Sequence, residues 1–331
     1  MCRGALVLAL CMLCATACSA RPPTFDPRDP RSPLRLVRTI PLPDVRGRID
    51  HMAIDQIANH LFVAELGNGS VDDVDLTASK VSHRISGLSE PQGLAWLPAT
   101  AELAVACGDG SVRFFRRSDW HEVARVSLGD DADNVRIDPR NGHLVVGYGT
   151  GGLAVIDPSS HQLLIRIQLS GHPEAFAIFG ARIFVNVPSR HTMAIVDMHQ
   201  GRVVSSLPLG ARAGNYPMAL NEGGSFIAVA FRFPASAAVF GVRTGRPLFA
   251  TQSCADADDL YFAGGRLAIV CGQGAVDLVS LATPHAVERV TTRVGARTGL
   301  LASDGKTLFI AVPKNNSVAE LWELTFNLRE P

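Results

Sequence analysis

The fold is decided by a short pattern that first occurs in residues 50–75, DHMAIDQIANHLFVAELGNGSVDDVD. A polar pair opens the pattern, and two apolar runs follow, the second of which, Leu61-Phe62-Val63-Ala64, has the composition and length of a β-strand. Gly67-Asn68-Gly69 then supplies the positive φ angles of a tight turn into a third run that ends at Asp75. The stretch therefore predicts three short antiparallel strands.

The same unit occurs seven times along the chain. Each copy opens with a residue pair that is polar or contains proline, and the second members of successive pairs lie 39 to 44 residues apart. The seven pairs are Asp50-His51, Pro91-Gln92, Asp133-Asn134, Pro173-Glu174, Pro217-Met218, Asp258-Asp259 and Arg297-Thr298. A repeat of about forty residues built from four short strands is typical of one blade of a β-propeller. The sequence therefore predicts an all-β, seven-bladed β-propeller.

The last unit lacks its fourth strand, because the chain ends soon after the third strand at 319–325. A matching strand occurs near the N-terminus, where residues 36–42 resemble the outer strands of the other units. Pairing of this strand with the last blade would close the ring and remove a free sheet edge. We therefore expect the propeller to span residues 34–325, followed by a C-terminal tail at 326–331.

The N-terminus has the pattern of an export signal. Arg3 precedes an apolar run, so residues 1–17 are interpreted as a signal peptide, too short for a spanning helix of about 20 residues. Ala15-Thr16-Ala17-Cys18 resembles a bacterial lipobox, which makes Cys18 the candidate lipidation site. The proline-rich residues 18–33 are interpreted as a tether to the outer membrane. Cleavage after Ala17 or Ala20, which would leave a soluble periplasmic protein, is the alternative.

The bulk composition limits the classes of partner. The chain has 31 basic and 31 acidic residues, and this balance argues against the broad basic surface that nucleic acids require. We expect a monomer that contacts the membrane only through its lipid anchor. Cys254 and Cys271 fall on one face of the same blade and could form a disulfide, but the pattern favours two separate buried residues.

The repeats resemble a known family. Units such as Leu61-Phe62-Val63-Ala64 and Leu308-Phe309-Ile310-Ala311 look like the repeats of YVTN-type, YncE-like bacterial β-propellers, and Arg48-Ile49-Asp50-His51 and Gly171-His172-Pro173-Glu174 look like an exported subgroup. The resemblance implies a seven-bladed exported propeller. It implies no catalytic residue, because that family has none that can be transferred to this chain.

The repeat symmetry predicts a functional site. Because blades are related by rotation, the opening pairs should gather as a ring at one end of the central axis, and concave sites with placed polar groups commonly bind ligands. The candidate residues are His51, Gln92, Asp133, Asn134, Glu174, Met218, Asp258, Asp259, Arg297 and Thr298. Acidic residues outnumber basic ones among them, which favours a cation or a positively charged ligand.

Two classes of function follow from this ring. The first is an exported binding or interaction module that uses its acidic face for a small ligand, a cation or an envelope protein. The second is an enzyme or accessory protein: a metal-dependent hydrolase similar in kind to the gluconolactonase-like propellers, or a partner of a periplasmic quinoprotein redox system. No cofactor is certain, but a divalent cation is possible, with His51, Asn134, Glu174 and Asp259 as candidate ligands. In the purely structural alternative, these residues cap strand ends and bind channel water, and Arg297 pairs with Asp258 or Asp50.

Overall fold

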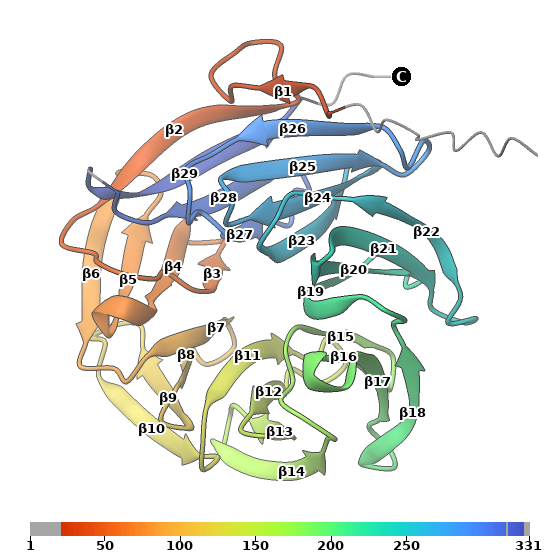
Figure 1. Ribbon diagram of the computed structural model, residues 1–331. Helices are drawn as coiled ribbons and strands as arrows, with labels where there is room; N and C mark the ends of the chain where they lie inside the picture. The colour runs from red at the N-terminus through yellow and green to blue at the C-terminus, as the bar shows by residue number, and fades with distance from the viewer. Residues whose placement is uncertain (1–20, 316, 328–331) are drawn as a thin grey trace, which may run out of the picture.

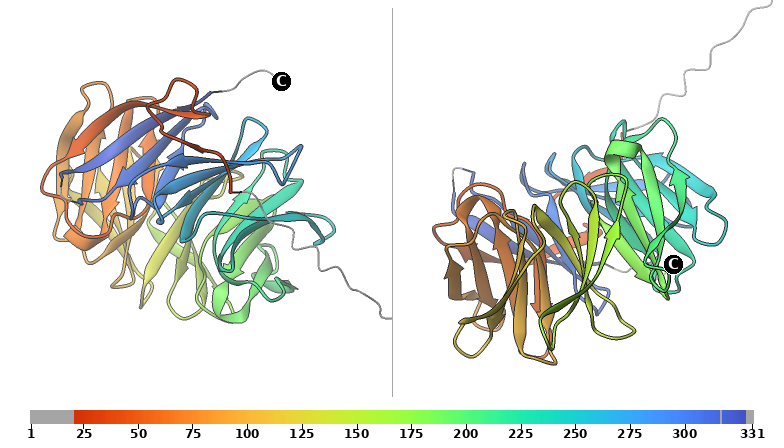
Figure 2. Two further views of the ribbon diagram at one scale, coloured as in Figure 1. Left: turned by 45° about the horizontal axis from the view of Figure 1, so that its top comes forward. Right: turned by 90° about the horizontal axis from the view of Figure 1, so that it is seen from below.

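Seven antiparallel sheets surround one axis in the structure, a computed structural model that describes residues 21–315 and 317–327. Figure 1 looks along this axis, and the first strand of each sheet lies nearest to it. The turned views in Figure 2 show the sheets standing side by side around the ring. The predicted all-β, seven-bladed β-propeller is confirmed.

Each blade consists of four antiparallel strands, from the inner strand at the axis to the outer strand at the rim. Blade 1 contains β3 (Met52–Asp55), β4 (His60–Glu65), β5 (Ser70–Asp75) and β6 (Lys80–Ser86). Blade 2 contains β7 (Pro91–Leu97), β8 (Glu102–Cys107), β9 (Ser111–Arg116) and β10 (Glu122–Ser127). Blade 3 contains β11 (Ala132–Ile137), β12 (Leu144–Tyr148), β13 (Gly152–Asp157) and β14 (Gln162–Gln168).

The second half of the chain repeats this arrangement. Blade 4 contains β15 (Phe176–Phe179), β16 (Arg182–Val187), β17 (Thr192–Asp197) and β18 (Arg202–Pro208). Blade 5 contains β19 (Ala213–Leu220), β20 (Phe226–Phe233), β21 (Ala235–Gly241) and β22 (Pro247–Gln252). Blade 6 contains β23 (Ala257–Ala263), β24 (Arg266–Cys271), β25 (Ala275–Ser280) and β26 (Val287–Thr291). Blade 7 contains β27 (Thr298–Leu301), β28 (Thr307–Val312), β29 (Ala319–Phe326) and β2 (Leu34–Leu42). Two short 3-10 turns cover Leu66–Asn68 and Pro188–Arg190.

The ring closes through the N-terminal strand. β2 pairs antiparallel with β29, with Ile40 opposite Leu321, so the chain's first long strand completes its last sheet. The two strands lie side by side at the top of Figure 1. The predicted closure is therefore confirmed, and it leaves blade 7 with four strands like the others.

The apolar core is divided among the contacts between blades. Buried side chains of the described residues form seven clusters, one between each pair of neighbouring blades. β8 shows why: Ala104 and Ala106 pack toward blade 3, whereas Leu103 and Val105 pack toward blade 1. Because successive side chains of a strand point to opposite faces, each blade buries both faces against its neighbours.

The N-terminal segment departs from the expected tether. Within the predicted tether, Thr24–Phe25 form β1, which pairs parallel with the outer strand β26 of blade 6. The backbone N–H of Leu36 also donates to the carbonyl of Pro27. From Thr24 onward the segment therefore lies against the propeller, because an unpaired edge at β26 offers it hydrogen-bond partners. At the other end β29 reaches Phe326, one residue into the predicted tail.

A disulfide joins Cys254 to Cys271, with their Cα atoms 5.9 Å apart. The interpretation of two separate buried residues was therefore wrong: the loop before β23 runs beside the end of β24, which brings both side chains together in the blade 5–blade 6 core. Cys107 is a buried free cysteine, and burial raises the pKa of its thiol to about 11.

The predicted signal peptide and the lipidation site Cys18 lie outside the described residues. In the part of the chain that is described, no helix has the length and hydrophobicity needed to cross a bilayer.

Candidate ligand site at the mouth of the propeller

The inner strands begin at one end of the axis, here called the mouth, and several of them begin irregularly. The pairing of the first and second strands shifts register at β7, β11, β19 and β23, next to the opening pairs of blades 2, 3, 5 and 6. A bulge adds a residue on one strand and turns side chains away from the regular alternation. The bulges therefore let two consecutive polar residues of a pair lie near the same site.

Some predicted ring residues connect neighbouring blades. The Asp259 carboxylate accepts a hydrogen bond from the N–H of Gly299 at 2.9 Å, and the Thr298 hydroxyl donates to the carbonyl of Ile49 at 3.1 Å. Gln92 donates through Nε2 to Asp131 at 2.9 Å. These three side chains bond groups of the next blade, as the structural alternative expects.

Of two other candidates, Met218 lies away from the charged centre of the mouth, and Arg297 has a different partner from the one expected. Met218 is buried in the apolar cluster between blades 4 and 5, beside Phe231. Arg297 forms an ion pair with Asp256, Nη2 to Oδ2 at 3.0 Å, rather than with Asp50 or Asp258.

The remaining candidates converge with an arginine that sequence reasoning did not single out. We define the mouth cluster as Arg48, Asp50, His51, Asp133, Glu174 and Asp258, which come from blades 1, 3, 4 and 6 and the loops before them. His51 Nε2 lies 3.8 Å from Asp133 Oδ1 and 3.9 Å from Asp50 Oδ1. Arg48 Nη2 lies 3.0 Å from Asp50 Oδ2 and 3.9 Å from Asp258 Oδ2. Rotation therefore does bring together side chains far apart in the sequence.

Arginines make the mouth a mixed-charge site rather than a purely acidic one. Arg232, at the end of β20, bonds Asp258 at 2.6 Å and Asp256 at 3.2 Å and lies over the Tyr216 ring at 4.1 Å. Arg136 lies 5.7 Å from the centroid of the Phe176 ring, and its charge acts on His51. Strand alternation would not have found Arg136, because the pairing of β11 shifts register between Ala132 and Val135 and interrupts the alternation at Asn134.

The carboxyl groups of the mouth cluster are harder to ionise than usual. Burial raises the pKa of Asp133 well above its ordinary value, and the nearby charges of Asp50 and Glu174 raise it further. Burial and the charge of Asp258 raise the pKa of Glu174 to about 7. Burial also raises the pKa of Asp50 and Asp258, although Arg48 and Arg232 respectively oppose this effect. These directions follow from placing several like charges together out of water.

His51 shifts in the opposite direction. Burial, followed by the charge of Arg136, lowers the pKa of its imidazole to about 4. The ring is therefore neutral at pH 7, so it does not offset the charge of the neighbouring carboxylates.

Two carboxyl groups of the mouth cluster have no arginine partner in residues 21–315 and 317–327. Among the described residues, the only basic groups within 4.0 Å of Asp133 are the imidazoles of His51 and His172. Glu174 has no basic group in ion-pair contact in the same residues, and only more distant arginines act on its charge. Negative charge at this side of the mouth is thus incompletely matched.

Asn134 adds an unpartnered acceptor beside these carboxyl groups. The residue is 2% exposed, its Nδ2 donates to Asp133 Oδ2 at 3.3 Å, and its Oδ1 accepts no hydrogen bond from any residue that the structure describes. Buried carbonyl oxygens nearly always accept a hydrogen bond. The backbone here is closely packed, because a Cβ at Gly93 of blade 2 would lie 2.0 Å from the carbonyl oxygen of Asp133.

The predicted metal ligands do not form a compact set. Asp259 is engaged by the backbone of blade 7, and no group of three or more His, Cys, Asp or Glu side chains is arranged to hold a metal ion among the described residues.

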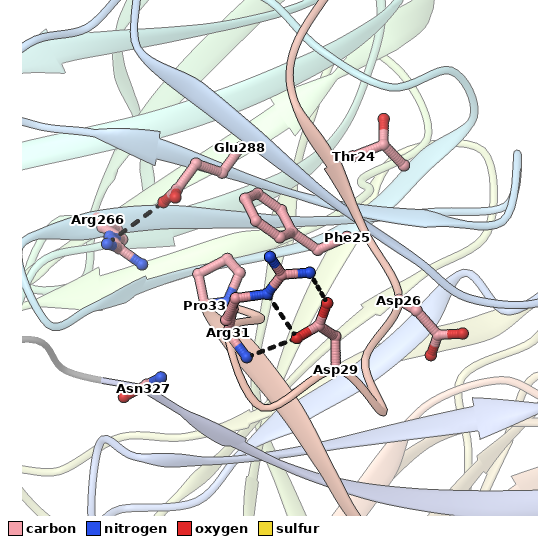
Figure 3. Close-up of a pocket in the computed structure, with 9 residues that line it drawn as sticks. All are labelled: Thr24, Phe25, Asp26, Asp29, Arg31, Pro33, Arg266, Glu288 and Asn327. Carbon is pink, nitrogen blue, oxygen red and sulfur yellow. Dashed lines mark hydrogen bonds and ion pairs between the residues drawn. The ribbon is translucent and has the colours of Figure 1, made fainter.

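A hollow lies at the rim, where the N-terminal segment crosses blade 6. Its volume is about 380 Å³, and Phe25 points into it (Figure 3). The charged groups in this hollow are already matched, because Asp29 pairs with Arg31 at 2.8 Å and Glu288 with Arg266 at 3.3 Å. The mouth therefore offers the stronger candidate site.

The fold and the mouth define a seven-bladed propeller with charged side chains at one end of its axis. No family model and no curated protein matches the chain. Among solved structures, the chain is similar to one titled Kuenenia stuttgartiensis hydrazine synthase, at 18% identity and a TM-score of 0.74 over 86% of this chain and 97% of that chain. Similarity at this level of identity shows the fold alone.

Proposed function

We propose that this protein is a binding protein that takes a small cationic ligand at its mouth. The observation that carries the proposal is the incomplete matching of Asp133 and Glu174, whereas Asp256 and Asp258 beside them are bonded by arginines. A partly buried carboxylate without a counter-charge is costly, so a ligand that supplies a positive charge gains more here than in water.

The structural surroundings support binding rather than a purely structural role. The orphaned Oδ1 of Asn134 offers a further acceptor next to Asp133. Bulged inner strands are also common next to functional sites. The propeller fold itself is a rigid scaffold that commonly presents such a face.

Titration calorimetry on the mature protein tests the proposal, with methylguanidinium, ethylammonium, Ca²⁺ and acetate as probes. We expect saturable binding of at least one cation and none of acetate. Asp133→Asn and Glu174→Gln should each weaken that binding by about tenfold, since each removes a carboxyl group whose ionised form a bound cation would stabilise. Asp119→Asn, an exposed carboxylate on blade 2, is the matched control. Unchanged affinity in both mouth variants, or binding of acetate alone, would overturn the proposal.

The same titrations test the alternatives. Stoichiometric binding of Ca²⁺ or another divalent ion that is lost in Glu174→Gln would support the metal-dependent, hydrolase-like class. A partnership with a redox system predicts instead that envelope redox proteins bind the mouth face, and that the two mouth variants weaken this binding.

We further propose that the protein works outside the cytoplasm as a lipid-anchored, monomeric member of the YVTN-type propellers. The Cys254–Cys271 disulfide supports an oxidising compartment. Mass spectrometry of the N-terminal peptide from the membrane fraction tests for lipid on Cys18, with Cys18→Ser as the control. Light scattering of the delipidated protein tests the monomer.

A further inference from the structure

The guanidinium group of Arg48 lies among carboxyl groups that come from four different blades. Besides Asp50 and Asp258, which it approaches to 3.0 and 3.9 Å, the charges of Asp133 and Glu174 also act on it. Burial alone would lower the pKa of Arg48, but these four carboxyl groups together raise it. A positively charged side chain of the protein therefore occupies the position that the proposed function assigns to a cationic ligand.

The backbone of Arg48 is fixed, but its side chain is only loosely held. The N–H of Gly67 donates to the Arg48 carbonyl at 2.9 Å, and a Cβ at Gly67 would lie 2.7 Å from the backbone nitrogen of Arg48. The backbones of these two loops are therefore in close contact. The side chain of Arg48 is nevertheless 49% exposed and makes one close ion pair.

Arg232 provides the contrast. Its side chain is 21% exposed, bonds two carboxylates at 2.6 and 3.2 Å and stacks over an aromatic ring. Long, exposed side chains change rotamer readily, whereas a side chain held by several contacts does not. Of these two arginines, Arg48 is therefore the one that can leave the mouth without disturbing the packing.

The mouth holds acceptor groups that no arginine of the described residues contacts. Asp133 and Glu174 have no arginine in contact among the described residues, and Asn134 Oδ1 is buried without a donor. A guanidinium is planar and carries five N–H donors, so it can serve a carboxylate and an amide oxygen together. An ammonium group or a metal ion lacks this planar, forked arrangement of donors.

We infer that the guanidinium group of Arg48 occupies the ligand site when no ligand is bound. The ligand is then a small guanidinium compound that displaces this side chain. This inference rests on the proposed function, because it assumes that the mouth binds a cation. On binding, the Arg48 side chain turns toward solvent, and the ligand's donors meet Asp133, Glu174 and the free oxygen of Asn134.

Calorimetric titration of the wild type and Arg48→Gln with methylguanidinium, ethylammonium and Ca²⁺ tests the inference. We expect Arg48→Gln to bind methylguanidinium at least fivefold more tightly than the wild type, because the internal competitor is gone and the mouth has lost a positive charge. Arg202→Gln, which removes an exposed arginine on the outer strand of blade 4, should leave the affinity unchanged. Adding Glu174→Gln to Arg48→Gln should abolish the gain.

Thermal unfolding gives a second, independent readout. If Arg48→Gln is destabilised, millimolar methylguanidinium should restore its unfolding midpoint more than ethylammonium does, since only a guanidinium replaces the lost group. Arg48→Lys keeps the charge without the fork and should respond to methylguanidinium less than Arg48→Gln does.

The outcomes separate the two proposals. Equal or weaker binding of methylguanidinium by Arg48→Gln overturns the role of Arg48, and a preference of that variant for ethylammonium or Ca²⁺ overturns the guanidinium class. In both cases cation binding at the mouth stands. Absence of binding of every cation by the wild type and by both Arg48 variants overturns this inference and the proposed function together.

Discussion

Blade 1 and the mouth both bury clusters of acidic side chains, but they match those charges differently. In blade 1, Asp72 accepts two hydrogen bonds from Arg84 at 2.6 and 2.7 Å. Asp73 is met by His60 at 2.6 Å, Ser82 at 2.8 Å and Arg117 at 3.1 Å. The third carboxyl group, Glu65, bonds the Ser70 hydroxyl, and burial raises its pKa to about 8, so that it is mostly neutral at pH 7.

In the mouth cluster, by contrast, no arginine of the described residues contacts Asp133 or Glu174, and the basic groups nearest to Asp133 are the imidazoles of His51 and His172, at 3.8 and 4.0 Å. The blade 1 acids are enclosed between strands with defined neighbours, whereas in the mouth cluster the Arg48 side chain is half exposed and Asp133 and Asp258 are only partly covered. Acidic composition alone therefore does not identify a binding site. A binding site is identified by acidic groups that lack partners and that a ligand can reach.

The largest expected effect would come from breaking the matched cluster. Arg84→Met leaves Asp72 buried without a counter-charge, which should destabilise the protein by about 3–5 kcal/mol in urea unfolding. Replacing both residues, as Arg84→Met with Asp72→Leu, should cost clearly less, since no unpaired charge remains. A single variant as stable as the wild type would show that blade 1 does not depend on this pairing.

Removing the disulfide beside the mouth should have the next largest effect. It closes a segment of 17 residues, so Cys254→Ser with Cys271→Ser should lower the free energy of unfolding by about 3 kcal/mol. Because Asp256 and Asp258 lie two and four positions after Cys254, the affinity of the mouth for a cation should fall as well. Reductant should destabilise the wild type but not the double variant. The same response in both proteins would contradict the prediction.

Glu174→Gln should change the pH dependence of stability. The pKa of Glu174 is about 7 in the folded protein against an ordinary value of 4.5, so the native state binds its proton more tightly. The stability contributed by this group is therefore present at low pH and is lost as pH rises from 4.5 through 7. The variant should equal the wild type at pH 4 and be about 1–2 kcal/mol more stable at pH 8, allowing for partial exposure. Lower stability of the variant at pH 8 would contradict this result.

The smallest effect is expected at the surface of blade 2. Arg116 and Asp119 form an ion pair at 2.7 Å with both side chains half exposed. Solvent screens such pairs, so Asp119→Asn should leave the thermal midpoint unchanged within error. A measurable loss there would show that exposure is a poor guide to which acids matter in this protein.

Much of the fold could be predicted because its signals are local and repeated. Strand composition in Leu61–Ala64, the Gly67-Asn68-Gly69 turn and the missing last strand each predicted a feature that the structure contains. The pairing of β1 could not be predicted, because prolines suggest an extended spacer and nothing in the sequence of this segment shows the free edge of β26 against which β1 pairs. The disulfide likewise depends on where a loop runs.

Within the candidate site, the positions of the ring could be predicted but not their partners. Rotational repetition placed His51, Asp133 and Glu174 near one another. It did not reveal that Met218 turns into the core, because the bulge in β19 sets its direction. Nor did it single out Arg48 and Arg232, which lie outside the opening pairs.

By itself the sequence determined the architecture of this protein. Its repeated alternation of apolar and polar residues favours sheets that pack around one axis, because each sheet then buries both of its faces against its neighbours. Which charges are matched was decided only by the tertiary structure. That outcome depends on the reach of individual arginine side chains across the axis, over distances of a few ångströms that no residue pattern specifies.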